Sequence, residues 1–171
     1  MQRLFFSLKF SNAQQQQLLP YQAQALTLCD NARAVDTDNL HLTLFFLGQV
    51  GTVQLQQLVS AAQSIKLPVF NLCLDYLACF TKAKILYLAP SNIPAELLSL
   101  QQILATRCQT IGFIDIHPKY RPHITLARHG LTESVIQVTP LCLRVVEFAL
   151  YCSENIDGKV RYRPLHIFQL Q

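Results

Sequence analysis

Two short segments of this chain combine a histidine and a threonine in the same order, His41-Leu42-Thr43-Leu44 and His123-Ile124-Thr125-Leu126. Because residues i and i+2 of a β-strand share a face, each segment would present an imidazole beside a hydroxyl. An imidazole, with a pKa of about 6.5, can act as base or acid near neutral pH, and a threonine hydroxyl can donate to a phosphate oxygen. If the two strands lie side by side, the four groups converge on one phosphorus atom and can perform in-line displacement without a metal ion.

A single motif of this kind is weak evidence, since a histidine on a strand is usually a half-buried spacer. The second copy, which follows Arg121-Pro122, makes coincidence a poor explanation. We interpret His117 and His129 as loop residues and His166 as a strand residue, and we assign none of them a role. The chain has no phosphate-binding glycine loop, no serine-nucleophile elbow and no common zinc spacing, so there is no support in the sequence for an ATP-dependent or metal-dependent mechanism.

The composition is typical of a packed globular protein, because 51% of the 171 residues are hydrophobic and only 14% are charged. No stretch approaches the roughly 20 apolar residues of a membrane span. The segment Met1 to Phe10 lacks a signal-peptide cleavage site, and we interpret it as the first strand of a cytoplasmic protein. The six cysteines lie singly in apolar segments without C-x-x-C spacing, so we expect reduced thiols.

The net charge of +4 does not by itself identify a nucleic-acid-binding protein. Its distribution is more informative, because positive residues flank the second histidine motif and recur at every second position near the C-terminus. The first cluster is Lys119, Arg121 and Arg128, and the second is Lys159, Arg161 and Arg163. Each cluster is either a solvated edge or a phosphate-binding rim, and the sequence leaves both interpretations open.

Hydrophobic periodicity predicts a mixture of strands and helices. The predicted strands are 4–10, 40–47, 69–76, 84–89, the second motif, 141–151 and 161–170, and the predicted helices are 11–29, 52–66 and 92–111. Asp157-Gly158 is a hairpin signal between the last two strands. Phe46 could stack on a base, but by alternation it shares a face with Leu42 and Leu44, so we favour a position in the core. The order favours an α+β fold whose sheets are mainly antiparallel.

Each half of the chain contains a strand, a helix and a His-x-Thr strand in the same order. This internal echo is typical of a duplicated unit with two-fold pseudosymmetry. There is no Pro/Gly/Ser-rich linker between the halves, so the sequence offers no clean domain boundary. We therefore expect residues 1–171 to form a single domain.

The longer segments around the two motifs, Asn39 to Gly48 and Tyr120 to Arg128, resemble the two signature motifs of a known family. These are the bacterial and archaeal RNA 2′,3′-cyclic phosphodiesterases, also called 2′-5′ RNA ligases, which are LigT-like members of the 2H phosphoesterase superfamily. The opening Arg3 to Phe6 and the closing Ser153 to Tyr162 are similar as well. The resemblance therefore spans nearly the whole chain.

The resemblance implies a bilobal α+β fold with two interleaved lobes, antiparallel sheets lining a central cleft and helices packed outside. It implies hydrolysis of a terminal RNA 2′,3′-cyclic phosphate to a 2′-phosphate, together with reversible, ATP-independent 2′-5′ joining of RNA ends. It implies no cofactor, no metal ion and no membrane, and we expect a monomer whose partner is RNA with cyclic phosphate ends or a related nucleotide. The residues it implicates are His41 as acid, His123 as base, and Thr43, Thr125, Arg121 and Arg128 as substrate-binding groups.

Two alternatives stay open beside this interpretation. One is a non-catalytic RNA-binding or nucleotide-binding module, and the other is a phosphodiesterase for another cyclic or 2′-5′-linked nucleotide. The family often carries a tryptophan or another aromatic residue before the first motif, whereas this chain has Ala34-Val35 there and no tryptophan at all. This departure bears on recognition of the base and not on the phosphate chemistry.

Overall fold

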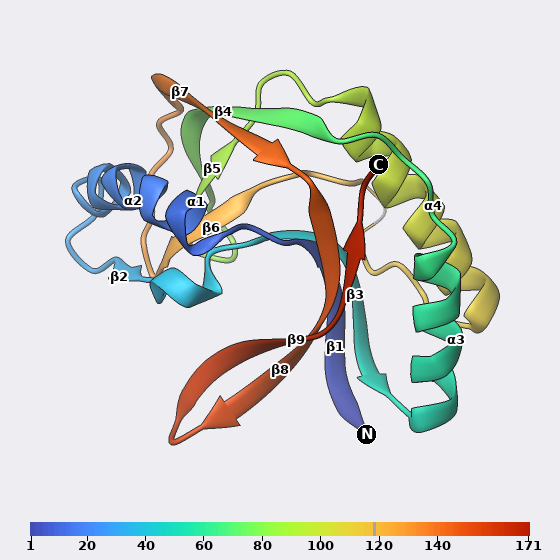
Figure 1. The fold of residues 1–171 in the computed structure, drawn as a ribbon. Helices are drawn as coiled ribbons and strands as arrows, with labels where there is room; N and C mark the ends of the chain where they lie inside the picture. The colour runs from blue at the N-terminus through green and yellow to red at the C-terminus, as the bar shows by residue number, and fades with distance from the viewer. Residues whose placement is uncertain (118) are drawn as a thin grey trace.

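The computed structural model describes residues 1–117 and 119–171. Strands and helices are mixed along the chain, and the last four elements are all strands (Figure 1). In order they are β1 (Gln2–Leu8), α1 (Asn12–Gln17), α2 (Leu19–Leu26), β2 (Arg33–Ala34), the 3₁₀ turn η1 (Thr37–Asn39), β3 (Leu42–Val50), α3 (Thr52–Gln63), β4 (Phe70–Phe80), β5 (Ile85–Ala89), α4 (Ala95–Ile111), β6 (Ile124–Arg128), β7 (Ile136–Val145), β8 (Glu147–Ile156) and β9 (Lys159–Gln169).

The strands form one antiparallel sheet in the order β7-β4-β5-β6-β3-β1-β8-β9, and the short β2 pairs with β6 beside this path. The two motif strands, β3 and β6, are therefore neighbours at the centre, with three strands beyond each. A single residue pair, Leu42 with Ile124, joins them. The predicted α+β class with antiparallel pairing is confirmed.

The helices lie beside different halves of this sheet. Helix α2 packs against β5 and β6, whereas α4 packs against β3 and α3 packs against α4 and β9. Figure 1 shows α1 with α2 on one side of the molecule and α3 with α4 on the other. The predicted helix over 11–29 is divided at Leu18, and Pro20 lies in the first turn of α2, where the missing N–H of proline costs no hydrogen bond.

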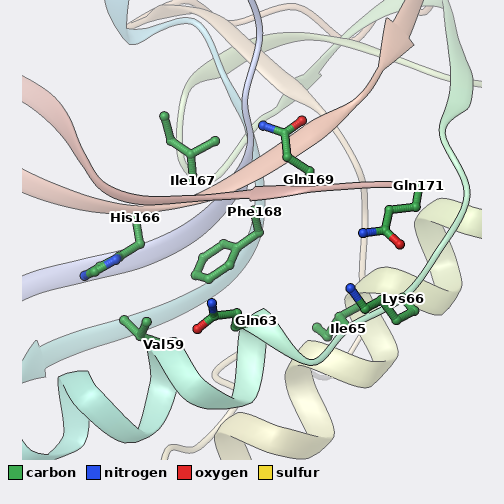
Figure 2. Close-up of a pocket in the computed structure, with 9 residues that line it drawn as sticks. All are labelled: Val59, Gln63, Ile65, Lys66, His166, Ile167, Phe168, Gln169 and Gln171. Carbon is green, nitrogen blue, oxygen red and sulfur yellow. The ribbon is translucent and has the colours of Figure 1, made fainter.

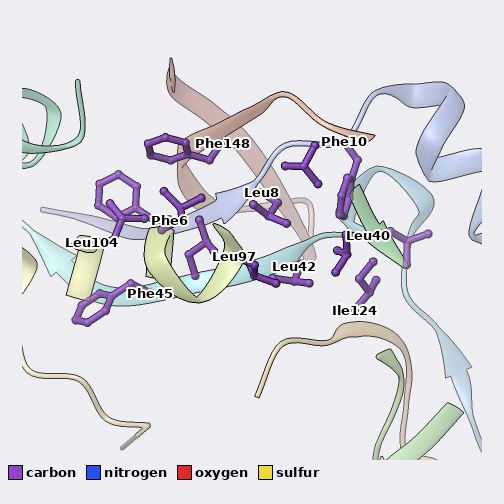
Figure 3. Packing of buried hydrophobic residues seen from close by; sticks show 14 of the residues in the cluster. Phe6, Leu8, Phe10, Leu40, Leu42, Phe45, Leu97, Leu104, Ile124 and Phe148 are labelled. Carbon is purple, nitrogen blue, oxygen red and sulfur yellow. The ribbon is translucent and has the colours of Figure 1, made fainter. Parts of the chain in front are cut away.

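One hydrophobic core runs beneath both motif strands (Figure 3). Leu42 and Ile124 are fully buried at its centre. Phe6 and Leu8 of β1, Phe148 of β8 and the α4 leucines pack around them. Burial of one face of each motif strand fixes its register, because a one-residue slip would expose these apolar side chains.

Two details of the chain bear on the expectations from the sequence. Cys73 and Cys142 stand directly opposite each other on β4 and β7 and form a disulfide, so the expectation of reduced thiols is wrong for this pair. Their separation of 69 residues leaves no spacing signal in the sequence.

The predicted hairpin between β8 and β9 is confirmed, with Asp157 and Gly158 both at positive φ, as its tight turn requires.

None of the helices in residues 1–117 and 119–171 is long and apolar enough to cross a membrane.

Candidate active site

The pairing of Leu42 with Ile124 sets the geometry of the two motifs. Since the strands are antiparallel, continuing this register sets His41 opposite Thr125 and Thr43 opposite His123. Leu42 and Ile124 point into the core, so the four flanking side chains share the opposite face. We call this surface of β3 and β6 the site face. On it the two imidazoles occupy one diagonal of a square, and the two hydroxyls occupy the other.

His41 is held through both ring nitrogens. Its Nδ1 lies 2.6 Å from the carbonyl oxygen of Asn39, and its Nε2 lies 3.0 Å from Oγ1 of Thr43. The carbonyl can only accept, so Nδ1 carries the proton and the neutral Nε2 accepts from the Thr43 hydroxyl. Asn39 is itself anchored, because its side-chain amide donates to the carbonyl of Val160 on β9 at 2.8 Å.

His123 repeats half of this arrangement. Its Nδ1 lies 2.7 Å from the carbonyl oxygen of Arg121, two residues earlier, as Asn39 precedes His41. The proton is therefore on Nδ1 here too, and Nε2 carries the lone pair. No hydrogen bond joins this Nε2 to Thr125 within the described part of the chain. The two rings thus share a tautomer and differ in what their second nitrogen contacts.

Aromatic rings from other strands of the sheet support each histidine. The His41 ring centroid is 5.1 Å from Phe5 and 4.9 Å from Tyr162. The His123 ring centroid is 4.8 Å from Phe80 and 5.5 Å from Tyr87. Each imidazole therefore rests against one phenylalanine and one tyrosine. Of these four, only Phe5 and Tyr162 lie within segments that carried the resemblance, and no motif marked Phe80 or Tyr87.

The buried setting lowers the pKa of both histidines. Burial, with smaller electrostatic contributions from His123 and Arg128, lowers the pKa of His41 to about 4, although the hydrogen bond to Asn39 acts in the opposite direction. Burial also lowers the pKa of His123, with smaller contributions from His117 and Arg128. Both rings are neutral at pH 7 in the free protein. The charge of Arg128 thus acts on both members of the pair.

A half-buried tyrosine holds the first motif strand in place. The Tyr120 hydroxyl donates to the backbone carbonyl of Thr43 at 3.2 Å. Burial raises the pKa of this phenol, which remains a donor throughout the neutral range. The segment leading into the second motif is thereby tied to the centre of the first.

The two motif strands carry the same irregularity just after their threonines. On β3 the partners of Phe6 and Ser7 are Phe45 and Thr43, which leaves Leu44 as an extra residue. A β-bulge of this kind reverses the alternation of faces beyond it. Phe45 is therefore buried, and Phe46 is 44% exposed. The prediction that Phe46 lies in the core is wrong, because alternation was counted through a bulge that the sequence did not reveal.

On β6 the bulge falls at the equivalent position. Leu86 pairs with Ala127 and Tyr87 pairs with Thr125, so Leu126 is the extra residue. Ala127 is then buried, and Arg128 is exposed. The bulge thus gives each half one outward residue after its motif, an aromatic ring at Phe46 and a cation at Arg128.

Two further residues, one predicted and one neglected, can now be placed. Arg121 gives His123 its backbone carbonyl, and its side chain is exposed. Burial raises the pKa of the nearby Tyr87 phenol, which the charge of Arg121 partly opposes. His117, which was assigned no role from the sequence, packs edge-on against Phe46 with ring centroids 5.8 Å apart. Its place beside the site left no signal in the sequence, because it lies in an irregular loop.

The C-terminal basic cluster behaves as a solvated edge. Arg161 pairs with Asp36 at 3.1 Å, and Arg163 pairs with Glu154 at 2.6 Å.

His166 lies on β9 and lines a pocket between this strand and the C-terminal end of α3, together with Gln63 and Lys66 (Figure 2). The motif residues do not line this pocket. Within residues 1–117 and 119–171, no three histidine, cysteine or acidic side chains are grouped to hold a metal ion.

Comparisons with known proteins identify the family of this chain. The family model described as LigT like Phosphoesterase matches residues 8–87. The RNA 2′,3′-cyclic phosphodiesterase of Escherichia coli (strain K12) is 32% identical over 96% of this chain and 94% of its own. The crystal structure of E. coli LigT complexed with 3′-AMP superposes with a TM-score of 0.87, at 30% identity, and covers 99% of this chain and 98% of that one.

A structure from Thermus thermophilus, 21% identical, has the same fold at a TM-score of 0.83 and covers 98% of this chain and 97% of that one. The relatedness at 32% identity extends over nearly the full length of both sequences and includes both motif strands. The chain belongs to the LigT-like phosphoesterase family.

Proposed function

We propose that this protein hydrolyses the 2′,3′-cyclic phosphate at RNA ends to a 2′-phosphate, with His123 as general base and His41 as general acid. The observation that supports this most is the register of Leu42 with Ile124, which sets two imidazoles on one diagonal and two hydroxyls on the other. In-line displacement needs a base and an acid on opposite sides of the phosphorus atom. The diagonal of imidazoles suits those two sides.

The steps follow from the Nε2 atoms of the two rings. Nε2 of His123 accepts a proton from water as the water oxygen attacks phosphorus. His41, which takes up a proton on Nε2 from solvent when the substrate binds, gives that proton to O3′ as the bond from phosphorus to O3′ breaks, leaving a 3′-hydroxyl and a 2′-phosphate. Exchange with solvent then restores the starting protonation of both rings. Thr43, Thr125, Arg121 and Arg128 are the groups we assign to the phosphate oxygens and the RNA.

The low pKa of His41 is compatible with its role as an acid once substrate is bound. In the free protein, burial keeps the ring neutral, with a pKa of about 4. A bound cyclic phosphate brings a negative charge against Nε2, and an adjacent anion raises the pKa of an imidazole. The Thr43 hydroxyl, which then no longer donates to Nε2, is released to donate to a phosphate oxygen.

The relatives support a nucleotide substrate. The E. coli relative is named for RNA 2′,3′-cyclic phosphodiester cleavage, and structures of E. coli LigT contain 3′-AMP, ATP, NADP+ or phosphate. In this chain the exposed ring of Phe46 offers a stacking surface for a base. The reversible 2′-5′ joining of RNA ends stays a prediction.

We also propose that residues 1–171 act as one domain made of two interleaved lobes, and as a monomer in the cytoplasm. The lobes would be β1, β3, β8 and β9 on one side and β4 to β7 on the other. Their shared hydrophobic core supports treating them as one unit.

The test is an assay of purified protein, in EDTA, on an oligoribonucleotide that ends in a 2′,3′-cyclic phosphate. We expect a 2′-phosphate product, identified by ³¹P NMR, and loss of turnover in His41→Ala and in His123→Ala. His166→Ala is the matched control, because this histidine lies on β9, outside the motifs, and should keep full activity.

The alternatives give different results. Binding of the oligonucleotide without product would favour a non-catalytic module. Faster conversion of a 2′-5′-linked or cyclic mononucleotide than of RNA would favour another phosphodiesterase. Full activity in either histidine variant would exclude the paired mechanism.

A further inference from the structure

Two arginines stand directly opposite each other beside the site face. Arg33 of β2 pairs with Arg128 of β6, and on its other side Arg128 pairs with Ile85 of β5. Directly opposed residues of antiparallel strands point to the same face, with Cβ atoms about 5 Å apart. Arg33 and Arg128 are therefore close neighbours, and both are exposed.

This juxtaposition is unfavourable in the free protein, because like charges placed opposite each other on adjacent strands repel. Within residues 1–117 and 119–171, the ion pairs are Lys9–Glu147, Arg161–Asp36 and Arg163–Glu154. None of them includes Arg33 or Arg128. Among the described residues the pair thus has no carboxylate partner to offset the repulsion, which is the arrangement expected where an anion binds.

Two lysines extend the charge away from the site. Lys82 and Lys84 are exposed in the tight turn between β4 and β5, and Lys84 directly precedes Ile85, the cross-strand partner of Arg128. They too are absent from the ion pairs of the described residues. We call Arg33, Arg128, Lys84 and Lys82 the basic row. It crosses β2, β6 and β5, about 10 Å at the usual strand spacing.

The basic row begins at the reaction centre. Arg128 acts electrostatically on both histidines. The turn that bears the lysines starts at Phe80, whose ring packs 4.8 Å from that of His123. A phosphodiester chain that crosses this side of the phosphate position therefore has Arg33 on one side of Arg128 and the turn lysines on the other.

We propose that the basic row binds the phosphodiester backbone of the RNA strand on the 5′ side of the terminal nucleotide. The inference rests on the proposed function and adds a substrate class, because it makes an oligonucleotide end a better substrate than a cyclic mononucleotide, which has no further phosphate. The row carries no aromatic side chain and no acceptor for base edges, so the contact is with phosphates and tolerates any sequence.

The experiment compares two substrates, a decaribonucleotide ending in a 2′,3′-cyclic phosphate and 2′,3′-cyclic AMP. In the wild type, kcat/KM for the decamer exceeds that for cyclic AMP, and it falls steeply with salt. In Arg33→Gln, and in the Lys82→Glu and Lys84→Glu double variant, kcat/KM for the decamer falls about tenfold or more. Its logarithmic salt slope shrinks by about 0.7 for each phosphate that the variant no longer neutralises. Turnover of cyclic AMP remains within about twofold of wild type.

Lys66→Glu is the charge-matched control, since Lys66 lies in the separate pocket near α3 and should leave both substrates unaffected. The inference is overturned if the wild type shows no preference for the decamer, or if the variants keep this preference and its salt slope. It is also overturned if Lys66→Glu lowers kcat/KM for the decamer as much as the basic-row variants do. Circular dichroism checks that each variant is folded.

Failure of the proposed function gives a different result. If the wild type converts neither substrate, this result contradicts the proposed chemistry but does not bear on the basic row. Fluorescence anisotropy with a labelled decamer then decides the inference without turnover. Weaker binding by Arg33→Gln than by Arg33→Lys supports the basic row, and equal binding by the two overturns it.

Discussion

The two motif strands are built alike and yet surround their histidines differently. On both β3 and β6 the imidazole Nδ1 donates to the carbonyl two residues earlier, a phenylalanine and a tyrosine support the ring, and a bulge follows the threonine. On β3, Thr43 also donates to Nε2 of His41, and Phe46 turns outward. On β6 the second nitrogen of His123 has no such bond among the described residues, and Arg128 turns outward.

This difference indicates how a duplicated scaffold can serve an asymmetric reaction. The backbone repeats the positions of the two rings, while the side chains around them give the two Nε2 atoms different contacts. Acid and base assignments arise where two titratable groups have environments that move their pKa values apart. The occupied Nε2 of His41 and the open Nε2 of His123 are the local features that make the two sites unequal.

The largest effect should come from removing either imidazole, and a sulfur substrate separates their roles. His41→Ala and His123→Ala should each lower kcat by roughly 10² to 10⁴ on the oxygen substrate. Replacing O3′ with sulfur gives a leaving group that needs no proton, so it should restore turnover to His41→Ala and not to His123→Ala. Single-turnover rates measure both. Rescue of His123→Ala instead would reverse the assignment of acid and base.

The next largest effect should come from mutating Leu42 or Ile124, the residue pair that joins the two motif strands. Leu42→Ala and Ile124→Ala each empty a fully buried position and should destabilise the protein by about 2 to 5 kcal/mol. Urea unfolding followed by circular dichroism measures this. Leu131→Ala, at a position that is 51% exposed, is the control and should change stability by less than about 0.5 kcal/mol. A small loss at Leu42 would mean that the two strands are not locked at this pair.

The pH dependence of stability should report the burial of His41. Its folded pKa of about 4 lies below the unfolded value of 6.5, so the unfolded chain binds more protons between these limits. Stability therefore falls as the pH drops from 6.5 to about 4, by roughly 2 to 3 kcal/mol. His41→Gln should flatten this part of the curve in urea titrations. An unchanged slope would show that His41 is not held neutral by the fold.

The smallest effect should distinguish the two threonines. Thr43→Val and Thr125→Val each remove one hydroxyl and should lower kcat/KM by about tenfold to a hundredfold. Only Thr43→Val removes a donor to the neutral His41 ring, so only this variant should raise the pKa of His41 in the free protein. NMR titration of the imidazole protons provides the measurement. If His41 has the same pKa in both variants, the hydrogen bond from Thr43 does not distinguish the two strands.

Much of the site could be predicted from the sequence, because its key features are local. A strand puts residues i and i+2 on one face, so His41 with Thr43 and His123 with Thr125 followed from spacing alone. The turn at Asp157-Gly158 and the helix break near Pro20 were likewise set by the chemistry of single residues. The α+β class followed from the order of these local patterns.

Only the tertiary structure decided how distant segments meet. The Leu42–Ile124 register, the Cys73–Cys142 disulfide and the Arg33–Arg128 pair join residues far apart in the chain, and such pairing depends on the packing of the whole sheet. The bulge at Leu44, which turned Phe46 outward, also arises from pairing between strands, so no periodicity within one strand could reveal it. The sequence by itself determined which groups could react, and the packed sheet determined which of them share a face.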